Sequence, residues 1–450
     1  MAWTMRSKLT WMMLLSIGCY DEPTPPADTD TDATGGTVAA TADGPATNSN
    51  TNATTGPTSD TNPPTTSADD TVSGPTTDDP TTDGSDSGDT GEVVCTDAVC
   101  YEDQLVLAAG TEPTDIVIAD IDDDGNLDIV TANRGSDNFS VHLGDGAGGF
   151  DLPAFFPVGA GPVTLAIASY NPDVDGLLDV VTGDQDGRTI TTLFNTGDGF
   201  LFDAASPTTL DIGQQADAAP LAAEVGVLTP DSLNAGCVMA LDSDQLLIMY
   251  GDGNGFSSDL DALPCTYGCD WVAAGNLTQD QYVDMLASNS TGLSGELTTL
   301  SLPFNVSTSD YGFQVPPTTV QLRDVDGDQR PDIVAANGPD GSVTVALGNG
   351  MGAFGPPTLT PAGSSPRAVD VGDADDDGNP DVIVVDTTDD TASVLLGDGA
   401  GGLAAPLSFA VGAEPWAVAV ADLDGDGRAD IVTANRSDGS ISVLLSELPG

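Results

Sequence analysis

Positive charge is the scarcest property of this sequence. Its 450 residues include 9 lysines and arginines against 71 aspartates and glutamates, for a formal net charge of −62. Binding to nucleic acid needs basic side chains that displace counterions from phosphates, so nucleic-acid binding is excluded. The one histidine, His142, leaves no material for a His-rich zinc site and no spare for a His-based catalytic triad.

Long apolar runs are also scarce, and the most prominent one stands at the N-terminus. Residues 9–17 (LTWMMLLSI) follow two positive charges, Arg6 and Lys8, and precede a Gly-Cys pair. The run is too short to span a bilayer, whereas this order of features is typical of an export signal. We therefore expect a signal peptide over residues 1–18 and no transmembrane segment elsewhere.

The end of that segment resembles the processing box of bacterial lipoproteins. It reads LSIGC, with Ser16 where leucine is common. We expect Cys19 to carry lipid, which would tether the protein to the outer membrane or the cell surface by this anchor alone. Cleavage without lipidation, followed by secretion, is the alternative.

Residues 19–92 consist mostly of Thr, Asp, Pro, Ser, Gly, Ala and Asn. Such a segment cannot bury enough apolar surface to offset the entropy of ordering. We expect a disordered linker that holds a folded domain, residues 93–450, away from a surface.

The folded part is repetitive. Asp-rich loops begin at Asp120, Asn171, Asn276, Asp324, Asp373 and Asp422, and the last three intervals are 48, 49 and 49 residues. A worn unit fits at residues 221–256, where GCVMALDSDQLLIMYGDGNGF matches DIVTANRGSDNFSVHLGDGAGGF of the first unit. Seven units of this period indicate a repeat array or a propeller.

Each unit contains short apolar runs separated by Gly and Asp turns, which is typical of β-structure. The last unit shows the order: WAVAVADL, the acidic loop, DIVTAN, a turn, and SISVLLS. Complete units add a fourth run such as LSFAVG. Four strands in each of seven units predict an all-β, seven-bladed β-propeller.

The chain ends indicate how the blades close. The sequence stops after a third strand, and it enters the array with QLVLAAGTEP, which matches the fourth-strand segment LSFAVGAEP. We expect this N-terminal strand to complete the last blade and close the ring, which removes a free edge. An open solenoid is the alternative.

Five loops have the pattern D-x-D-x-D-x-x-x-D or a near relative, numbered here as positions 1 to 9. Carboxylates at positions 1, 3, 5 and 9, with a backbone carbonyl from position 7, form a set of hard oxygen ligands that suits Ca²⁺. The predicted ligands are Asp120, Asp122, Asp124, Asn126 and Asp128; Asn171, Asp173, Asp175 and Asp179; Asp324, Asp326, Asp328, Arg330 and Asp332; Asp373, Asp375, Asp377, Asn379 and Asp381; and Asp422, Asp424, Asp426, Arg428 and Asp430.

Two details refine this prediction. An EF-hand is excluded, because position 12 is not Glu and lies in an apolar strand. Position 6 is Gly in four loops, which permits a sharp turn, but Gln329 stands there in the fifth unit and predicts strain. The fourth unit, with Asn276, Thr278, Asp280 and Asp284, is a doubtful site, and the third unit has lost the acids.

Residues 104–450 resemble FG-GAP or VCBS-type repeats, the propeller units also found in integrin α-subunits. The motifs that carry this resemblance are DLDGDGRADIVTANRSDGSISVLL and DIDDDGNLDIVTANRGSDNFSVHLGDGAGGF. The resemblance implies that the calcium loops are structural. It does not choose a function, because the family includes adhesion proteins, lectins and parts of polysaccharide-degrading enzymes.

Six cysteines are present, and export favours disulfides. With Cys19 lipidated, we expect two local bridges, Cys95–Cys100 and Cys265–Cys269, and a buried Cys237. Redox or metal roles for these pairs are the alternative.

A partner could bind the face opposite the acidic loops. Trp271, Arg367 and Trp416 occupy matching positions at the start of first strands and could stack on sugars or hold a carboxylate. Packing between neighbouring blades is the alternative for both tryptophans.

No GxSxG motif stands out, most clustered acids are accounted for as metal ligands, and the only lysine is in the signal. We expect a non-catalytic module that binds an unknown protein or glycan. A lectin is the second reading, and a calcium-dependent polysaccharide lyase is the third.

Overall fold

The computed structural model describes residues 94–95, 99–170, 177–197, 201–202, 207–212, 220–226, 236–242, 245–251, 256–264, 270–279, 284–288, 295–301, 305–313 and 316–447. The chain divides into two compact units, Met1–Asp21 with Gly91–Gly450 and Glu22–Thr90. All described residues belong to the first unit. The predicted signal peptide, Cys19 and the predicted linker lie outside them.

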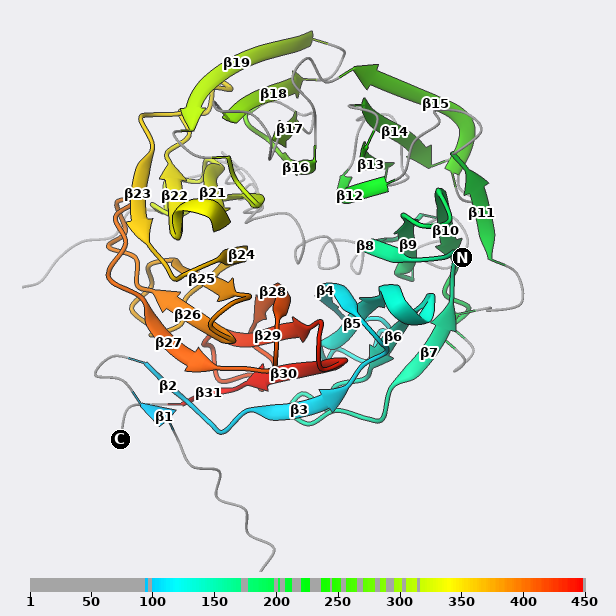
Figure 1. Ribbon diagram of the computed structural model, residues 1–450, viewed down its shortest axis with the longest axis horizontal. Coiled ribbons are helices and arrows are strands. Elements are labelled where there is room, and N and C mark those ends of the chain that lie inside the picture. Colours follow the sequence, from blue (N-terminus) through cyan, green and yellow to red (C-terminus); the bar gives the residue numbers. More distant parts are fainter. Residues whose placement is uncertain are drawn as a thin grey trace, which may run out of the picture. The chain divides into compact units, whose positions relative to one another are not determined.

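The described chain is all-β apart from two 3-10 turns, η1 (Arg134–Ser136) and η2 (Gly338–Asp340). Antiparallel four-stranded sheets lie around a common centre as the blades of a β-propeller, with the first strand innermost and the fourth at the rim (Figure 1). None of the described helical segments has the length and apolar character needed to cross a membrane.

Three sheets follow one another in the first half of the described chain. One contains β4 (Pro113–Ala119), β5 (Asp128–Asn133), β6 (Asn138–His142) and β7 (Ala154–Pro157). The next contains β8 (Pro162–Ala168), β9 (Asp179–Asp184), β10 (Thr189–Leu193) and β11 (Thr208–Asp211). The worn repeat supplies β12 (Pro220–Gly226), β13 (Gly236–Leu241), β14 (Gln245–Gly251) and β15 (Phe256–Pro264).

Three more sheets repeat the same order. Their strands are β16 (Trp271–Gly275), β17 (Asp284–Ser288), β18 (Gly295–Ser301) and β19 (Asn305–Phe313). Then come β20 (Thr319–Arg323), β21 (Asp332–Asn337), β22 (Ser342–Ala346) and β23 (Thr358–Pro361). The last of the three contains β24 (Pro366–Gly372), β25 (Asp381–Asp386), β26 (Thr391–Leu395) and β27 (Leu407–Ala410).

One sheet combines strands from both ends of the chain. It contains β28 (Pro415–Ala421), β29 (Asp430–Asn435), β30 (Ser440–Leu444) and β3 (Leu105–Ala108). Leu105 lies opposite Val443 and Ala108 opposite Ser440, in antiparallel register. A small sheet beside it, which the sequence did not predict, pairs β1 (Val94–Cys95), β2 (Cys100–Tyr101) and β31 (Ser446–Glu447).

The core lies between successive sheets. The second strands β5, β9, β21, β25 and β29 are buried along their whole length. Their sequences are therefore nearly continuous apolar runs rather than alternating ones, because side chains on both faces are covered.

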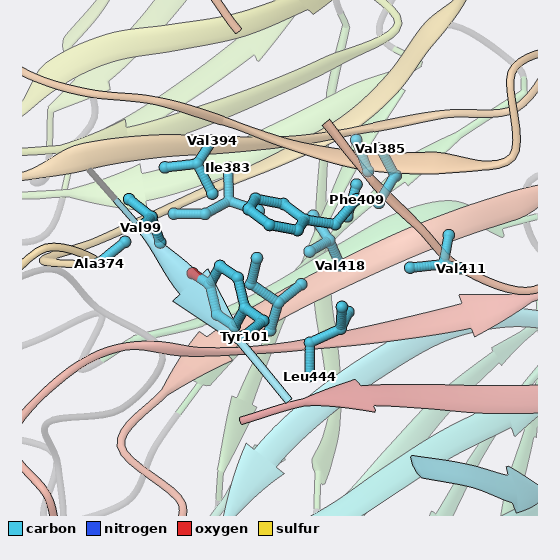
Figure 2. Close-up of a cluster of buried hydrophobic side chains, with 13 residues drawn as sticks. Val99, Tyr101, Ala374, Ile383, Val385, Val394, Phe409, Val411, Val418 and Leu444 are labelled. Carbon is cyan, nitrogen blue, oxygen red and sulfur yellow. The ribbon is translucent and has the colours of Figure 1, made fainter. Parts of the chain in front are cut away.

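One core cluster contains residues from β2. Tyr101 is fully buried among Ile383, Phe409 and Leu444, and its ring meets that of Phe409 edge to face at a centroid distance of 4.8 Å (Figure 2). Val99 is in the same cluster. The N-terminal segment is thus packed into the propeller core before it enters β3.

Candidate functional site

Each acidic loop joins the first strand of a blade to the second, and position 9 is the first residue of the second strand. The backbone turns through left-handed conformations at position 6, where Gly125, Gly378 and Gly427 have φ of 93°, 82° and 91°. Gln329 adopts a φ of 65° at the same position. That region favours glycine, so this loop carries the backbone strain expected from its sequence.

Carboxylates at positions 1, 3 and 9 converge in four loops. In each set, one oxygen from every carboxylate lies within 4.8 Å of the others. The sets are Asp120, Asp122 and Asp128; Asp324, Asp326 and Asp332; Asp373, Asp375 and Asp381; and Asp422, Asp424 and Asp430. Because these ligands are hard oxygens in a tight loop, they fit Ca²⁺.

The electrostatics of the sets also fit a cation. Burial, with the like charge of position 3, raises the pKa of Asp128, Asp332 and Asp430 to about 7 and that of Asp381 to about 6. In addition, Asp373 has a buried oxygen, Oδ1, without a hydrogen-bond partner. A divalent ion would offset the repulsion and satisfy that oxygen.

Position 9 also has a structural role that does not need metal. Asp430 Oδ2 accepts from the Leu423 amide at 2.7 Å, and Oδ1 accepts from the Ser446 amide at 2.7 Å. The same two bonds occur at Asp128, Asp332 and Asp381. This carboxylate therefore ties the loop to the end of the third strand in each of these blades.

The position 5 carboxylates contact position 7 instead of joining the clusters. Asp124 accepts from the backbone amide of Asn126 at 2.8 Å and from its side-chain amide at 2.9 Å. Asp377 and Asn379 repeat this pattern, and Arg330 and Arg428 take the role of the amide in their loops. Position 7 thus fixes the position 5 side chain.

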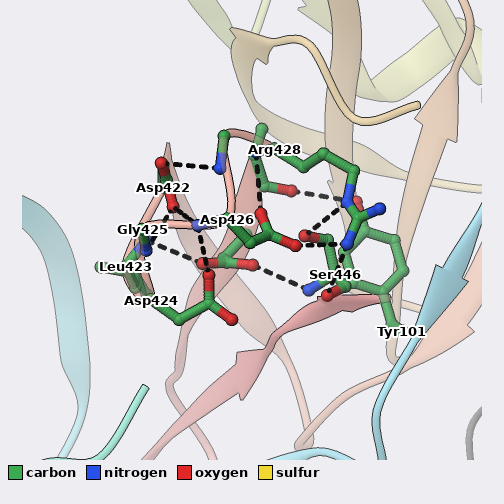
Figure 3. A network of polar contacts seen from close by, with 11 residues as sticks. Tyr101, Asp422, Leu423, Asp424, Gly425, Asp426, Arg428 and Ser446 are labelled. Carbon is green, nitrogen blue, oxygen red and sulfur yellow. Dashed lines mark hydrogen bonds and ion pairs between the residues drawn. The ribbon is translucent and has the colours of Figure 1, made fainter. Parts of the chain in front are cut away.

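The last loop is further connected to the N-terminal segment (Figure 3). Arg428 pairs with Asp426 and donates from Nε to Ser446 Oγ at 3.4 Å. Tyr101 donates its hydroxyl to the Ala429 carbonyl at 3.4 Å. The loop, β31 and β2 therefore form one polar network.

The loops of the second and fourth units are described in part. Asn171, Asp173 and Asp175 lie outside the described residues, but Asp179 accepts from the amides of Tyr170 and Asn195 at 3.0 and 2.9 Å. In the fourth unit, Asp280 is also outside. Asp284 accepts from both the amide and the hydroxyl of Thr278, at 2.8 and 2.9 Å, and its Oδ1 is buried without a hydrogen-bond partner.

The three predicted partner-binding residues meet at the opposite end of the inner strands. The Arg367 guanidinium carbon lies 4.2 Å from the ring centroid of Trp416 and 5.5 Å from that of Trp271. Arg436 lies over Trp416 as well, at 4.3 Å. Arg436 directly follows β29, and nothing in its local sequence indicates that it shares a ring with Arg367.

Trp271 and Trp416 stand at the end of the inner strands that we call the mouth. Together with these strands they line a cavity of about 130 Å³. Arg323 and Asp370 form an ion pair of 3.1 Å there. Asp370 also accepts from the Val420 amide of the next blade at 3.0 Å, and Asp115 accepts from the Leu165 amide at 2.7 Å. Charged residues inside the otherwise apolar first strands were the available sequence signal for these contacts, which were not predicted.

With this geometry in view, comparison with known proteins identifies the repeats. Residues 324–384 and 373–433 match the model of the FG-GAP-like repeat. The chain contains FG-GAP-like repeats. No curated protein sequence matches the chain.

Solved structures share the propeller fold. The propeller superposes on BBS1N, solved in complex with ARL6DN, with a TM-score of 0.55 and 12% identity, covering 78% of this chain and 97% of that one. Virginiamycin B lyase from Staphylococcus aureus gives 0.53 and 11%, covering 76% and 99%. Hydrazine synthase from Kuenenia stuttgartiensis gives 0.50 and 11%, covering 81% and 100%. At these identities the likeness is one of fold alone.

Among the described residues, the cysteines and the histidine belong to neither the carboxylate clusters nor the arginine–tryptophan cluster. Cys100 is disulfide-bonded, and Cys95 lies opposite it in the strand register. Cys237 is a buried thiol in β13, while Cys265 and Cys269 lie outside the described residues. His142 is fully buried, with Nε2 3.0 Å from the Ala108 carbonyl, and burial lowers its pKa.

Proposed function

We propose that this chain is an exported, surface-tethered FG-GAP propeller that is stabilised by calcium and binds a protein or glycan without catalysis. The observation that carries the proposal is the pairing of two features at opposite ends of the inner strands. Three-carboxylate clusters recur at one end, and an arginine–tryptophan cluster stands at the other.

We also propose that the blades number seven and close into a ring. Two observations support closure. The N-terminal strand β3 pairs with β30 of the last sheet. Contacts between innermost strands also run from β4 through β8, β12, β16, β20, β24 and β28, and from β28 back to β4. In a closed ring, the first and last blades pack against each other and only the short outer edge of each blade stays unpaired.

Calcium would act as a structural ion in this proposal. It would be held by positions 1, 3 and 9, and it would neutralise carboxylates whose pKa burial raises. The aspartates at position 9 already hold each loop to its blade, so the ion would join the carboxylates of positions 1 and 3 to that of position 9. Binding to the native state alone would raise stability.

A binding role is favoured over catalysis by the same geometry. The base of a polysaccharide lyase is usually Lys or His. The only lysine is Lys8, and His142 is buried with its Nε2 against a backbone carbonyl. A lectin is the second candidate, since tryptophan rings at a mouth can stack on sugars. It is less favoured, because two guanidiniums already lie on Trp416.

Parallel glycan-array and peptide-array binding, with the same ligands assayed for turnover, tests this function. We expect calcium-dependent binding on one array and no product. Release of unsaturated or shortened oligosaccharide would contradict the non-catalytic role. Fractionation of cells that express the Cys19→Ala variant tests the tether: we expect the wild type in the membrane fraction and the variant in the soluble one.

A further inference from the structure

Arg367 is a cation held without a carboxylate. Its Nη1 donates to the Thr318 carbonyl at 3.2 Å, and its guanidinium lies over Trp416 and Trp271. Within the described part of the chain, Arg367 forms no ion pair of 4.0 Å or less, whereas Arg134, Arg323, Arg330, Arg428 and Arg436 each do. The charge of Asp115 acts on Arg367 without forming an ion pair with it.

The neighbouring Arg436 increases the excess of positive charge. Its contacts with Glu112 and Glu414 are long, at 3.7 and 3.9 Å. Burial and the charge of Arg436 together lower the pKa of Arg367 to about 10. Both guanidiniums lie against the ring of Trp416, so this end of the inner strands is locally positive. A locally positive region favours an anion.

We propose that Arg367 and Arg436 bind one carboxylate, and that it is the terminal carboxylate of a polypeptide whose neighbouring residues are neutral or basic. Guanidinium forks match carboxylates in geometry and charge. The rest of the ligand would meet a strongly acidic molecule, which attracts basic peptides and repels acidic polysaccharides. This inference rests on the proposed binding function and names the ligand class for the mouth.

The tryptophans provide a direct readout. The chain has four, of which Trp3 and Trp11 lie in the first 18 residues and Trp271 and Trp416 lie beside Arg367. The full chain, with calcium present, is titrated with a basic pentapeptide that ends in a free carboxylate. The same peptide with a C-terminal amide is the matched ligand, and trigalacturonate is the acidic glycan. Tryptophan emission and titration calorimetry both follow binding.

We expect the free acid to bind about tenfold or more tightly than the amide, because a charge-assisted bidentate contact is lost. Arg367→Gln and Arg436→Gln should each remove this preference, and Arg367→Lys should reduce it. Arg134→Gln is the control, since Arg134 lies in a matching turn on this face and pairs with Asp186. A melting temperature for each variant guards against unfolding.

Equal affinity for acid and amide would overturn the proposal, as would a preference that survives Arg367→Gln in a folded variant. Tighter binding of trigalacturonate than of the acid peptide would assign the mouth to an acidic glycan instead. These failures are distinguishable from failure of the proposed function. A propeller that binds elsewhere would still capture array ligands, and Arg367→Gln would leave that capture unchanged.

Discussion

Asp430 and Ser446 are joined by a hydrogen bond of 2.7 Å between a carboxylate oxygen of the acidic loop and the amide that follows the third strand. The other oxygen of Asp430 accepts from Leu423, inside the loop. One buried aspartate thus connects the loop to the blade on both sides. The same residue supplies a ligand atom to the carboxylate cluster. The Asp430 side chain therefore both stabilises the fold and contributes to the candidate metal site.

Replacing this aspartate should weaken the protein even without metal. In Asp430→Asn, the new amide group cannot accept from both backbone amides, so one buried donor is left unpaired at a cost of about 1–3 kcal/mol. Urea denaturation in chelator measures the loss. Asp424→Asn, which changes position 3 of the same loop, should leave this chelator value within about 0.5 kcal/mol of wild type. Equal losses in both variants would contradict the structural role of position 9.

Calcium affinity should depend on position 3 and not on position 4. Asp122 belongs to a carboxylate cluster, whereas the adjacent Asp123 does not and has a left-handed φ of 60° that Asn tolerates. Titration calorimetry should find one fewer calcium site, or one weakened site, in Asp122→Asn. Asp123→Asn should bind as wild type does. Loss of a site in both variants would indicate general electrostatics instead of ligation.

The N-terminal strand offers a matched pair that tests ring closure. Leu107 in β3 packs against a core cluster, while Val106 beside it is 55% exposed. Leu107→Asp should place an unpaired charge against the core and lower the free energy of unfolding by about 2–4 kcal/mol. Val106→Asp should change it little. A Leu107→Asp protein as stable as the Val106→Asp control would show that β3 contributes nothing to the fold.

Asp184 should make stability depend on pH. It ends β9, accepts from the hydroxyls of Thr182, Thr189 and Thr191, and is fully buried, which raises its pKa from 3.8 to about 6. The native state therefore holds this proton more tightly than the unfolded state. The stability contributed by Asp184 should then fall by up to about 3 kcal/mol as pH rises from about 4 to 6.

The equivalent residue in other blades suggests a control variant for Asp184. Asn133, Asn337 and Asn435 occupy the position of Asp184 in other blades and donate to nearby hydroxyls. Asp184→Asn should therefore remove the fall between pH 4 and 6 and raise stability at pH 7. Urea denaturation of both proteins at several pH values isolates the effect, since the acidic loops are common to both. Parallel pH curves would contradict a raised pKa at Asp184.

Much of this architecture could be predicted because fixed motif positions in each repeat mark where its strands and turns begin. Asp at position 9 of an acidic loop is the first residue of the second strand. In the last unit, the segment DIVTAN begins with this aspartate, Asp430, and forms β29. The segment that begins at Gln104 resembles a fourth strand, and this likeness predicted that β3 pairs with β30 of the last blade. Glycine at position 6 predicted the left-handed turns, and Gln329 at the same position predicted a strained one.

Other features depend on contacts that no local pattern contains. The position 5 carboxylates face position 7 because a donor side chain happens to be within reach. The two-residue strands β1, β2 and β31 are too short for a periodic signal, so the burial of Tyr101 could not be anticipated. The stacking of Arg367 on Trp271 requires strands two blades apart in the chain to converge.

The melting temperature with and without calcium tests the central claim most directly. Full-length protein is scanned by calorimetry in excess chelator and again with calcium about a hundredfold above its dissociation constant. Each independent site should then add about 2.7 kcal/mol of stability. The account predicts a melting temperature that rises with calcium, and rises less in Asp122→Asn. A melting temperature that chelator and calcium leave unchanged would contradict it.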